Sequence, residues 1–136
     1  MPCGEHLERL YRVFPWPDDP FTEEGFKRYV KAVDTFKRVL EHRWLRERIE
    51  GGGRPLSVID VCSGCGIGGV ALAKALSERG IGAELTLVDL RGTALEKAVE
   101  FARRELGLKL EVVVHNVLEP FPQELLRRFD VAILWG

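Results

Sequence analysis

The periodicity of hydrophobic and polar positions changes at the glycine run of residues 51–53. Before the run, apolar side chains recur at helical spacing, which predicts one long amphipathic helix over 23–49 with Thr22 as its N-cap. The apolar positions of this helix are Phe26, Tyr29, Val30, Val33, Phe36, Leu40, Trp44 and Leu45. We expect this stripe to pack on the rest of the protein.

After the glycine run, short apolar segments alternate with segments of helical periodicity. The expected strands are 56–61, 84–88, 110–114 and 131–135. The expected helices are 69–79, a helix that begins at a Thr93–Glu96 capping box and ends at Gly107, and 121–128. This alternation predicts right-handed crossovers and an α/β fold with a Rossmann-like, doubly wound parallel sheet.

Polar residues and glycines follow the predicted strands at their carboxyl ends. Residues 60–68 follow the first strand, Asp89 the second, His115 and Asn116 the third, and Trp135 the fourth. Ligands of doubly wound sheets bind beyond the carboxyl ends of the strands, at the point where the strand order reverses. We therefore expect these residues to surround a ligand site.

The glycine-rich segment after the first strand is compatible with two kinds of ligand. The spacing Gly64-x-Gly66-x-x-Gly69, with Asp89 about 20 residues further on, matches the dinucleotide fingerprint and favours an NAD(P)-dependent oxidoreductase. Asp60, however, lies four residues before Gly64 and would repel a pyrophosphate. The same carboxylate would attract the ammonium and sulfonium groups of S-adenosylmethionine.

From residue 56 to residue 136 the chain resembles class I, Rossmann-like S-adenosylmethionine-dependent methyltransferases. Asp60, Gly64 and Gly66 match the acid and the alternating glycines of the first motif of the family, and Cys62 replaces its first glycine. This replacement predicts that the position needs a small side chain rather than a positive φ. Asp89 matches the acid that follows the second strand in the family.

The resemblance implies a role for each cofactor-binding residue. The methionine part of S-adenosylmethionine would lie on the loop and Asp60, the ribose hydroxyls on Asp89, and the adenine near Leu90. Asn116 would accept from the adenine amino group through its amide oxygen, although a simple turn role for it is nearly as well supported. The implied cofactor-binding residues are Asp60, Cys62, Gly64, Gly66, Gly68, Asp89, Leu90 and Asn116.

The resemblance also implies how the chain is organised. We expect residues 1–53 to form a helical segment that packs on or caps the cofactor site, with Tyr29 or Trp16 over the cofactor. Residues 54–136 would hold the cofactor-binding half, with strand order 3-2-1-4 and truncation after the fourth strand. The apolar fourth strand would then be an open edge, which predicts self-association.

Composition narrows the function only a little. A formal net charge of -1 carries no strong nucleic-acid signal, and no apolar run is long enough to span a membrane. Three cysteines argue against a disulfide framework and favour a cytoplasmic location, and a Cys-x-x-Cys pair supplies only two of the four ligands of a structural zinc, so no metal is expected. One asparagine and one glutamine among 30% charged residues form a thermophile-like profile.

The sequence thus predicts a methyltransferase, with its acceptor and its catalytic residues unassigned. Methyl transfer relies largely on positioning, so no nucleophile is required in the chain. The alternatives are an oxidoreductase with a dinucleotide in the same loop, and a non-catalytic binding or scaffold domain of the same fold. The chain could also be inactive as a fragment.

Overall fold

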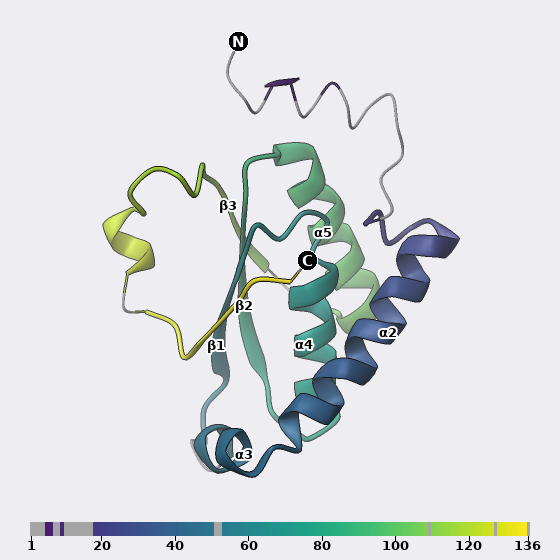
Figure 1. Ribbon diagram of the computed structural model, residues 1–136, viewed down its shortest axis with the longest axis vertical. Helices are drawn as coiled ribbons and strands as arrows, with labels where there is room; N and C mark the ends of the chain where they lie inside the picture. The colour runs from purple at the N-terminus through teal and green to yellow at the C-terminus, as the bar shows by residue number, and fades with distance from the viewer. Residues whose placement is uncertain are drawn as a thin grey trace.

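The computed structural model describes residues 5, 6, 9, 18–50, 53–108, 110–126 and 128–135. In chain order the elements are α2 (Glu23–Leu40), α3 (Arg43–Ile49), β1 (Leu56–Val61), α4 (Ile67–Ser77), β2 (Ala83–Asp89), α5 (Gly92–Leu106), β3 (Leu110–Val114), the 3₁₀ helix η1 (Gln123–Leu125) and β4 (Val131–Ile133) (Figure 1). Within these residues, no helix combines the length and the apolar character that crossing a membrane requires.

The four strands form one parallel sheet in the order β3-β2-β1-β4, which confirms the predicted order. From β1 to β3 the chain moves in one direction, and α4 and α5 both lie on the same side of the sheet as α2 (Figure 1). The chain then returns to place β4 beside β1, and the segment around η1 covers the opposite face. Right-handed crossovers produce this arrangement when the chain first adds β2 and β3 on one side of β1 and then adds β4 on the other side. The strand order therefore reverses between β1 and β4.

The core is divided by the sheet into a large and a small cluster. Val58 and Leu87 face the helices, while the neighbouring residues Ile59 and Val88 face the η1 segment, as expected for alternating strand residues. Helix α4 is buried on almost every side, because α2 packs on it from outside and the sheet from inside. This explains why its sequence is apolar all round rather than amphipathic.

The long helix predicted over 23–49 is wrong, because the structure contains two helices. Thr22 caps α2 as predicted and accepts a hydrogen bond from the Gly25 N–H at 3.0 Å. Helix α2 ends at Leu40, and His42 has an extended backbone before α3 begins. Past Leu40 a straight helix would leave the core, and the bend lets α3 bury Ile49 while Trp44 stays exposed.

Several other predicted elements differ in their bounds. Helix α4 begins at Ile67, two residues earlier than expected, and Arg91 rather than Thr93 is the N-cap of α5, without a side-chain cap. The helix expected over 121–128 is only the short η1, which follows Pro122. Strand β4 ends at Ile133 rather than at 135 because it pairs with only three residues of β1 before that strand turns into the next loop.

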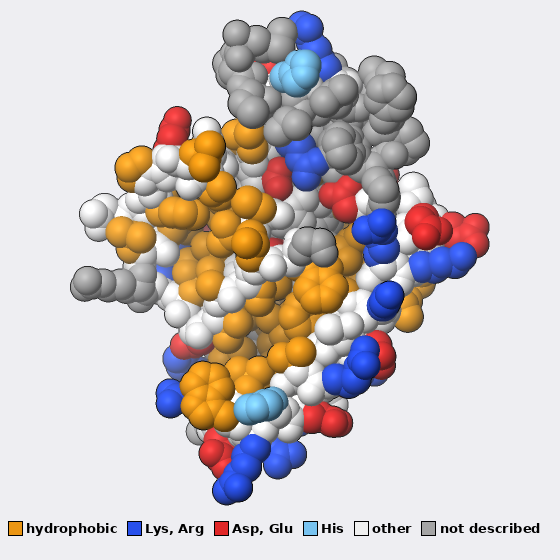
Figure 2. All heavy atoms as spheres, viewed as in Figure 1, with side chains coloured by type: hydrophobic (Ala, Val, Ile, Leu, Met, Phe, Trp, Pro, Cys, Tyr) orange, Lys and Arg blue, Asp and Glu red, His pale blue; other side chains and the backbone are white. Residues whose placement is uncertain are grey.

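The β4 side of the molecule carries exposed apolar side chains. Leu134 is 74% exposed and Trp135 is 37% exposed just after the strand. Hydrophobic side chains form a strip between the α2 side and the β4 side of this face (Figure 2). Among the described residues, β4 pairs with β1 alone, so its other edge has no strand partner.

Candidate functional site

The loop of residues 62–66, here called the glycine loop, connects β1 to α4. Its backbone enters the left-handed region at every second residue, with φ of 57° at Cys62, 55° at Gly64 and 83° at Gly66. The prediction that Cys62 does not need a positive φ is therefore wrong. Cys62 has the conformation that favours glycine, which costs a side-chain-bearing residue roughly 1–2 kcal/mol. The spacing of the glycines was itself the signal for this conformation.

Asp60 is a buried carboxylate at the end of β1, only 1% exposed. Its Oδ2 accepts a hydrogen bond of 2.8 Å from the Gly69 N–H in the first turn of α4, whereas its Oδ1 has no partner among the described residues. Burial raises the pKa of Asp60 to about 7; the Gly69 N–H opposes this rise and the nearby Asp89 adds to it. Position 69 must be small, because an added Cβ would lie 2.9 Å from Asp60 Oδ2.

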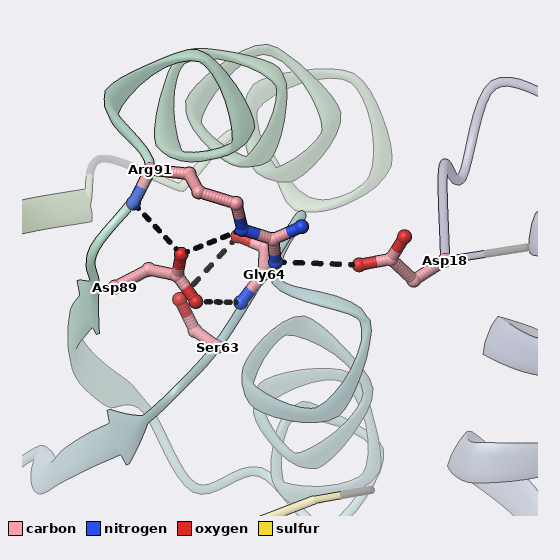
Figure 3. A network of polar contacts seen from close by, with 5 residues as sticks. All are labelled: Asp18, Ser63, Gly64, Asp89 and Arg91. Atoms are coloured by element: carbon pink, nitrogen blue, oxygen red, sulfur yellow. Dashed lines mark hydrogen bonds and ion pairs between the residues drawn. The ribbon is translucent and has the colours of Figure 1, made fainter. Parts of the chain in front are cut away.

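Asp89 at the end of β2 is held from both sides. Its Oδ2 accepts from the Gly64 N–H at 2.8 Å, and its Oδ1 accepts from the N–H and the Nε–H of Arg91 at 2.9 and 3.0 Å (Figure 3). Arg91 also reaches Asp18, with 3.8 Å between Nη2 and Oδ2. A carboxylate offers about four acceptor positions, so these three hydrogen bonds leave capacity for a ligand hydroxyl.

A cavity of about 680 Å³ opens between α2, the glycine loop and Trp135. This size is typical of small-molecule sites. It lies where the strand order reverses, because the glycine loop follows β1 and Trp135 follows β4. Its lining consists of Asp18, Glu24, Lys27, Arg28, Lys31, Thr35, Cys62, Ser63, Gly64, Ile67, Gly68, Arg91 and Trp135.

The fold that carries this cavity recurs in solved structures. The chain aligns with the CMeT domain of the citrinin polyketide synthase at 22% identity and a TM-score of 0.60, over 83% of this chain and 31% of that one. It aligns with EvdMO1 at 19% identity and a TM-score of 0.57, over 96% and 28% of the two chains. A proposed RNA methyltransferase, PH1948 from Pyrococcus horikoshii, aligns at 17% identity and a TM-score of 0.52, over 98% and 57%.

The chain has the class I methyltransferase fold. At these identities the likeness is one of fold, and the chain spans about a third of the length of the first of these structures. No protein-family model and no curated protein matches the sequence.

Within the class I fold, the predicted site residues separate into three groups. Cys62, Gly64 and Gly68 line the cavity, and Gly68 lets Trp135 approach so closely that an added Cβ would lie 2.5 Å from the Trp135 Cβ. Asp60 and Gly66 lie beneath the loop; an added Cβ at Gly66 would be 2.9 Å from the Ala98 Cβ. These two residues shape the loop from below rather than line the cavity.

The third group, Asp89, Leu90 and Asn116, lies at the ends of β2 and β3 and does not line the cavity. The His115 N–H donates to the Asp89 carbonyl at 3.0 Å, which brings the two strand ends together. The Asn116 Oδ1 accepts from the Leu118 N–H at 3.0 Å and so forms a local turn. The oxygen expected to accept from adenine therefore already has one backbone donor, in agreement with the turn role.

The expectation that Tyr29 covers the cofactor is wrong. Tyr29 is buried in the core, where its ring meets Phe101 edge to face at 4.8 Å, and burial raises the pKa of its hydroxyl. Trp16, the other residue expected to close over the cofactor, lies outside the described residues.

Asp18 and Arg91 are the site residues that sequence reasoning missed. An added Cβ at Gly64 would lie 2.6 Å from Asp18 Oδ2 and 3.0 Å from Arg91 Nη2, so both groups sit directly on the glycine loop. The neighbouring Asp19 forms an ion pair with Lys97 of α5. The two adjacent acids before α2 were the available sequence signal for a site contribution from this segment. Nothing in the local sequence indicated that they would reach the residues of α5 and its N-cap.

Among the described residues, neither cysteine of the loop forms a disulfide. Cys65 is buried, and Cys62 is exposed at the cavity. Partial desolvation and the carboxylates of Asp89 and Asp60 raise the pKa of the Cys62 thiol, against a smaller opposite effect of Arg91. A thiol with a raised pKa is a weak nucleophile at neutral pH, which favours a role for Cys62 in shaping the loop.

Proposed function

We propose that the chain binds S-adenosylmethionine and is the cofactor-binding part of a methyltransferase. The observation that carries this proposal is Asp60, a buried carboxylate with one oxygen that lacks a donor among the described residues. A cationic ligand on the glycine loop above Asp60 would balance the negative charge of its ionised form. A pyrophosphate would instead bring negative charge toward both Asp60 and Asp89, which disfavours a dinucleotide.

The proposed arrangement assigns each part of the cofactor to one group of residues. The methionine part would lie against the glycine loop above Asp60, the ribose hydroxyls at the remaining acceptor position of Asp89, and the adenine near Leu90 and Asn116. The cofactor supplies a methyl group already activated on a sulfonium. The chain contributes binding and orientation, with residues 54–136 as the binding half and residues 1–53 as the segment that closes the site from the α2 side.

Calorimetric titration with S-adenosylhomocysteine and, separately, with NADH tests this proposal. Asp89→Ala is expected to weaken S-adenosylhomocysteine binding by about 1.5–3 kcal/mol, roughly ten- to a hundredfold, because a charged acceptor is lost. Asp89→Asn keeps the shape of the side chain and controls for disturbance of Gly64 and Arg91. Asp34→Ala removes an exposed carboxylate of α2 that pairs with Arg38 on the surface, and should leave the affinity unchanged.

The other outcomes of this titration discriminate between the alternatives. Binding of NADH without S-adenosylhomocysteine would replace the proposal with an oxidoreductase. Binding of neither ligand would favour a non-catalytic domain of the same fold. An Asp89→Ala variant with unchanged S-adenosylhomocysteine affinity would remove Asp89 from the site.

We also propose that the chain self-associates through the free edge of β4. The exposed Leu134 and Trp135 beside an unpaired strand edge support this proposal. Light scattering is expected to show a dimer or a larger species, and Leu134→Lys should shift it toward the monomer. Leu118→Lys, at a 90% exposed position after β3, is the matched control. A wild-type chain that stays monomeric at high concentration would contradict this proposal.

A further inference from the structure

The cavity beside the glycine loop has a basic wall that the proposed cofactor contacts do not use. Lys27, Arg28 and Lys31 line it from α2. Lys27 pairs with Glu23 at 3.4 Å, on the surface of the helix. Arg28 and Lys31 form no ion pair with any residue that the structure describes, so no described carboxylate neutralises their charge.

The acidic residues around the cavity do not cancel this charge. Among the described residues, its lining contains four cations, with Arg91 as the fourth, and two carboxylates, Asp18 and Glu24. Asp18 lies opposite Arg91, which is itself bound to Asp89. The surplus positive charge therefore lies on α2, although the whole chain has a formal net charge of -1.

The part of the lining beside the start of α4 is apolar. Ile67 and Trp135 lie there, and the Trp135 ring packs against Phe36 of α2, with 5.0 Å between the ring centroids and an interplanar angle of 41°. Because Gly68 has no side chain, Trp135 packs directly on the start of α4 and is held in place. A ligand in this cavity can therefore meet both the cations of α2 and the apolar surface of Trp135 and Ile67.

We propose that this cavity binds a small organic acid whose carboxylate or phosphate group meets Arg28 and Lys31 and whose apolar body lies on Trp135 and Ile67. The assignment of this acid as the methyl acceptor rests on the proposed function. The binding of the acid does not. The cavity volume of about 680 Å³ leaves room for such a molecule near the loop. A nucleic acid fits less well, because two unpaired cations beside Glu24 and Asp18 offer few phosphate contacts.

Three probes with the same ring system test the charge requirement: 2-naphthoate, 2-naphthyl phosphate and the uncharged 2-naphthalenemethanol. Titration at low salt is expected to show that the two acids bind about tenfold more tightly than the alcohol, and that added salt reduces this difference. The ratio between the two acids identifies which anionic group the site prefers. Trp135→Ala should weaken all three probes by a similar factor.

The variant Arg28→Ala/Lys31→Ala is expected to bring both acids to the affinity of the alcohol. Both side chains are exposed, so the core stays intact. Arg38→Ala/Arg46→Ala removes the same charge from α2 and α3 outside the cavity and should leave the preference for acids unchanged. Equal binding of acids and alcohol to the wild-type protein would overturn the inference.

Titrations with S-adenosylhomocysteine and with a single-stranded RNA 20-mer complete the test. If Arg28→Ala/Lys31→Ala weakens S-adenosylhomocysteine but not the acids, the cations serve the cofactor and the inference is wrong. If the RNA binds more tightly than the acids and the same variant abolishes it, the surface is a nucleic-acid site instead. If the acids bind as expected while S-adenosylhomocysteine does not, the proposed function fails and the acid site stands.

Discussion

Asp60 is expected to lower the stability of the folded chain as the pH rises from about 4 to about 7, and Asp60→Asn is expected to remove this contribution. In the folded state the pKa of Asp60 is raised from 3.8 to about 7. Between these values the folded protein holds a proton that the unfolded chain has released, so rising pH favours unfolding. At about 1.4 kcal/mol per pKa unit, the ionised carboxylate costs the folded state about 4 kcal/mol above pH 7.

Asparagine at position 60 keeps an acceptor for the Gly69 N–H and has no charge to bury. Urea denaturation of wild type and Asp60→Asn at pH 5 and at pH 8 measures the effect. The variant should be the more stable protein at pH 8, with a smaller difference at pH 5. Both proteins share the three histidines, so the difference between them isolates Asp60. Asp34→Asn, at an exposed position of α2, should behave as wild type.

The same carboxylate links ligand binding to protons. Under the proposed function, the ammonium group of S-adenosylhomocysteine favours ionised Asp60, so binding at pH 6 should release up to one proton. Calorimetry in buffers with different heats of ionisation measures this number. Asp60→Asn should bind more weakly and release no proton. Equal proton release by both proteins would show that the ligand does not reach Asp60.

Gly25→Ala is expected to destabilise the protein strongly, although alanine is normally the better helix residue. An added Cβ would lie 1.8 Å from the Asp19 carbonyl oxygen and 2.5 Å from its carbon, and backbone atoms cannot rotate away. The Asp19 carbonyl accepts from the N–H and from the hydroxyl of Thr22, at 3.1 and 2.7 Å. Displacing it would disrupt the start of α2 and pull Asp19 away from Lys97.

We expect a loss of about 2–4 kcal/mol, made up of overpacking and a lost helix cap. Gly92→Ala is the matched control, because position 92 is also in the first turn of a helix and an added Cβ there meets only Val114, at 3.8 Å. This control should be unchanged or more stable by about 0.4–1 kcal/mol. Urea denaturation compares the two variants, and a Gly25→Ala protein as stable as Gly92→Ala would refute the prediction.

Asp18 connects this clash with the site. It precedes Asp19 and reaches Arg91 over the glycine loop (Figure 3). Under the proposed function, Gly25→Ala should therefore also weaken S-adenosylhomocysteine binding at a urea concentration where the variant is still folded.

The local elements of the sheet were largely readable from the amino-acid pattern. The bounds of β1 and β3 agree with their apolar runs, Gly107 ends α5 in a left-handed conformation, and Thr22 caps α2. These features depend on side-chain periodicity and backbone preference over a few residues, which a sequence expresses directly. The cytoplasmic location and the thermophile-like character stay predictions of composition alone.

Where local backbone preference and tertiary packing disagreed, the helix bounds predicted from the sequence were wrong. Residues 41–42 look helical, yet the chain bends there because the core ends at Leu40. Thr93 and Glu96 have the spacing of a capping box, yet Arg91 begins the helix and its N–H donates to Asp89. In both places a contact with a distant or buried group determined where the backbone is helical.

The sequence by itself determined the parallel sheet, its strand-end residues and the candidate cofactor loop, because each is expressed in a short stretch of chain. Only the tertiary structure decided that Asp60 keeps an oxygen without a donor among the described residues, that Asp18 and Arg91 meet over Gly64, and that the cations of α2 face Trp135. These relations join residues tens of positions apart. The distance and the burial of such groups depend on how helices pack on the sheet, and burial then determines which charges need a partner.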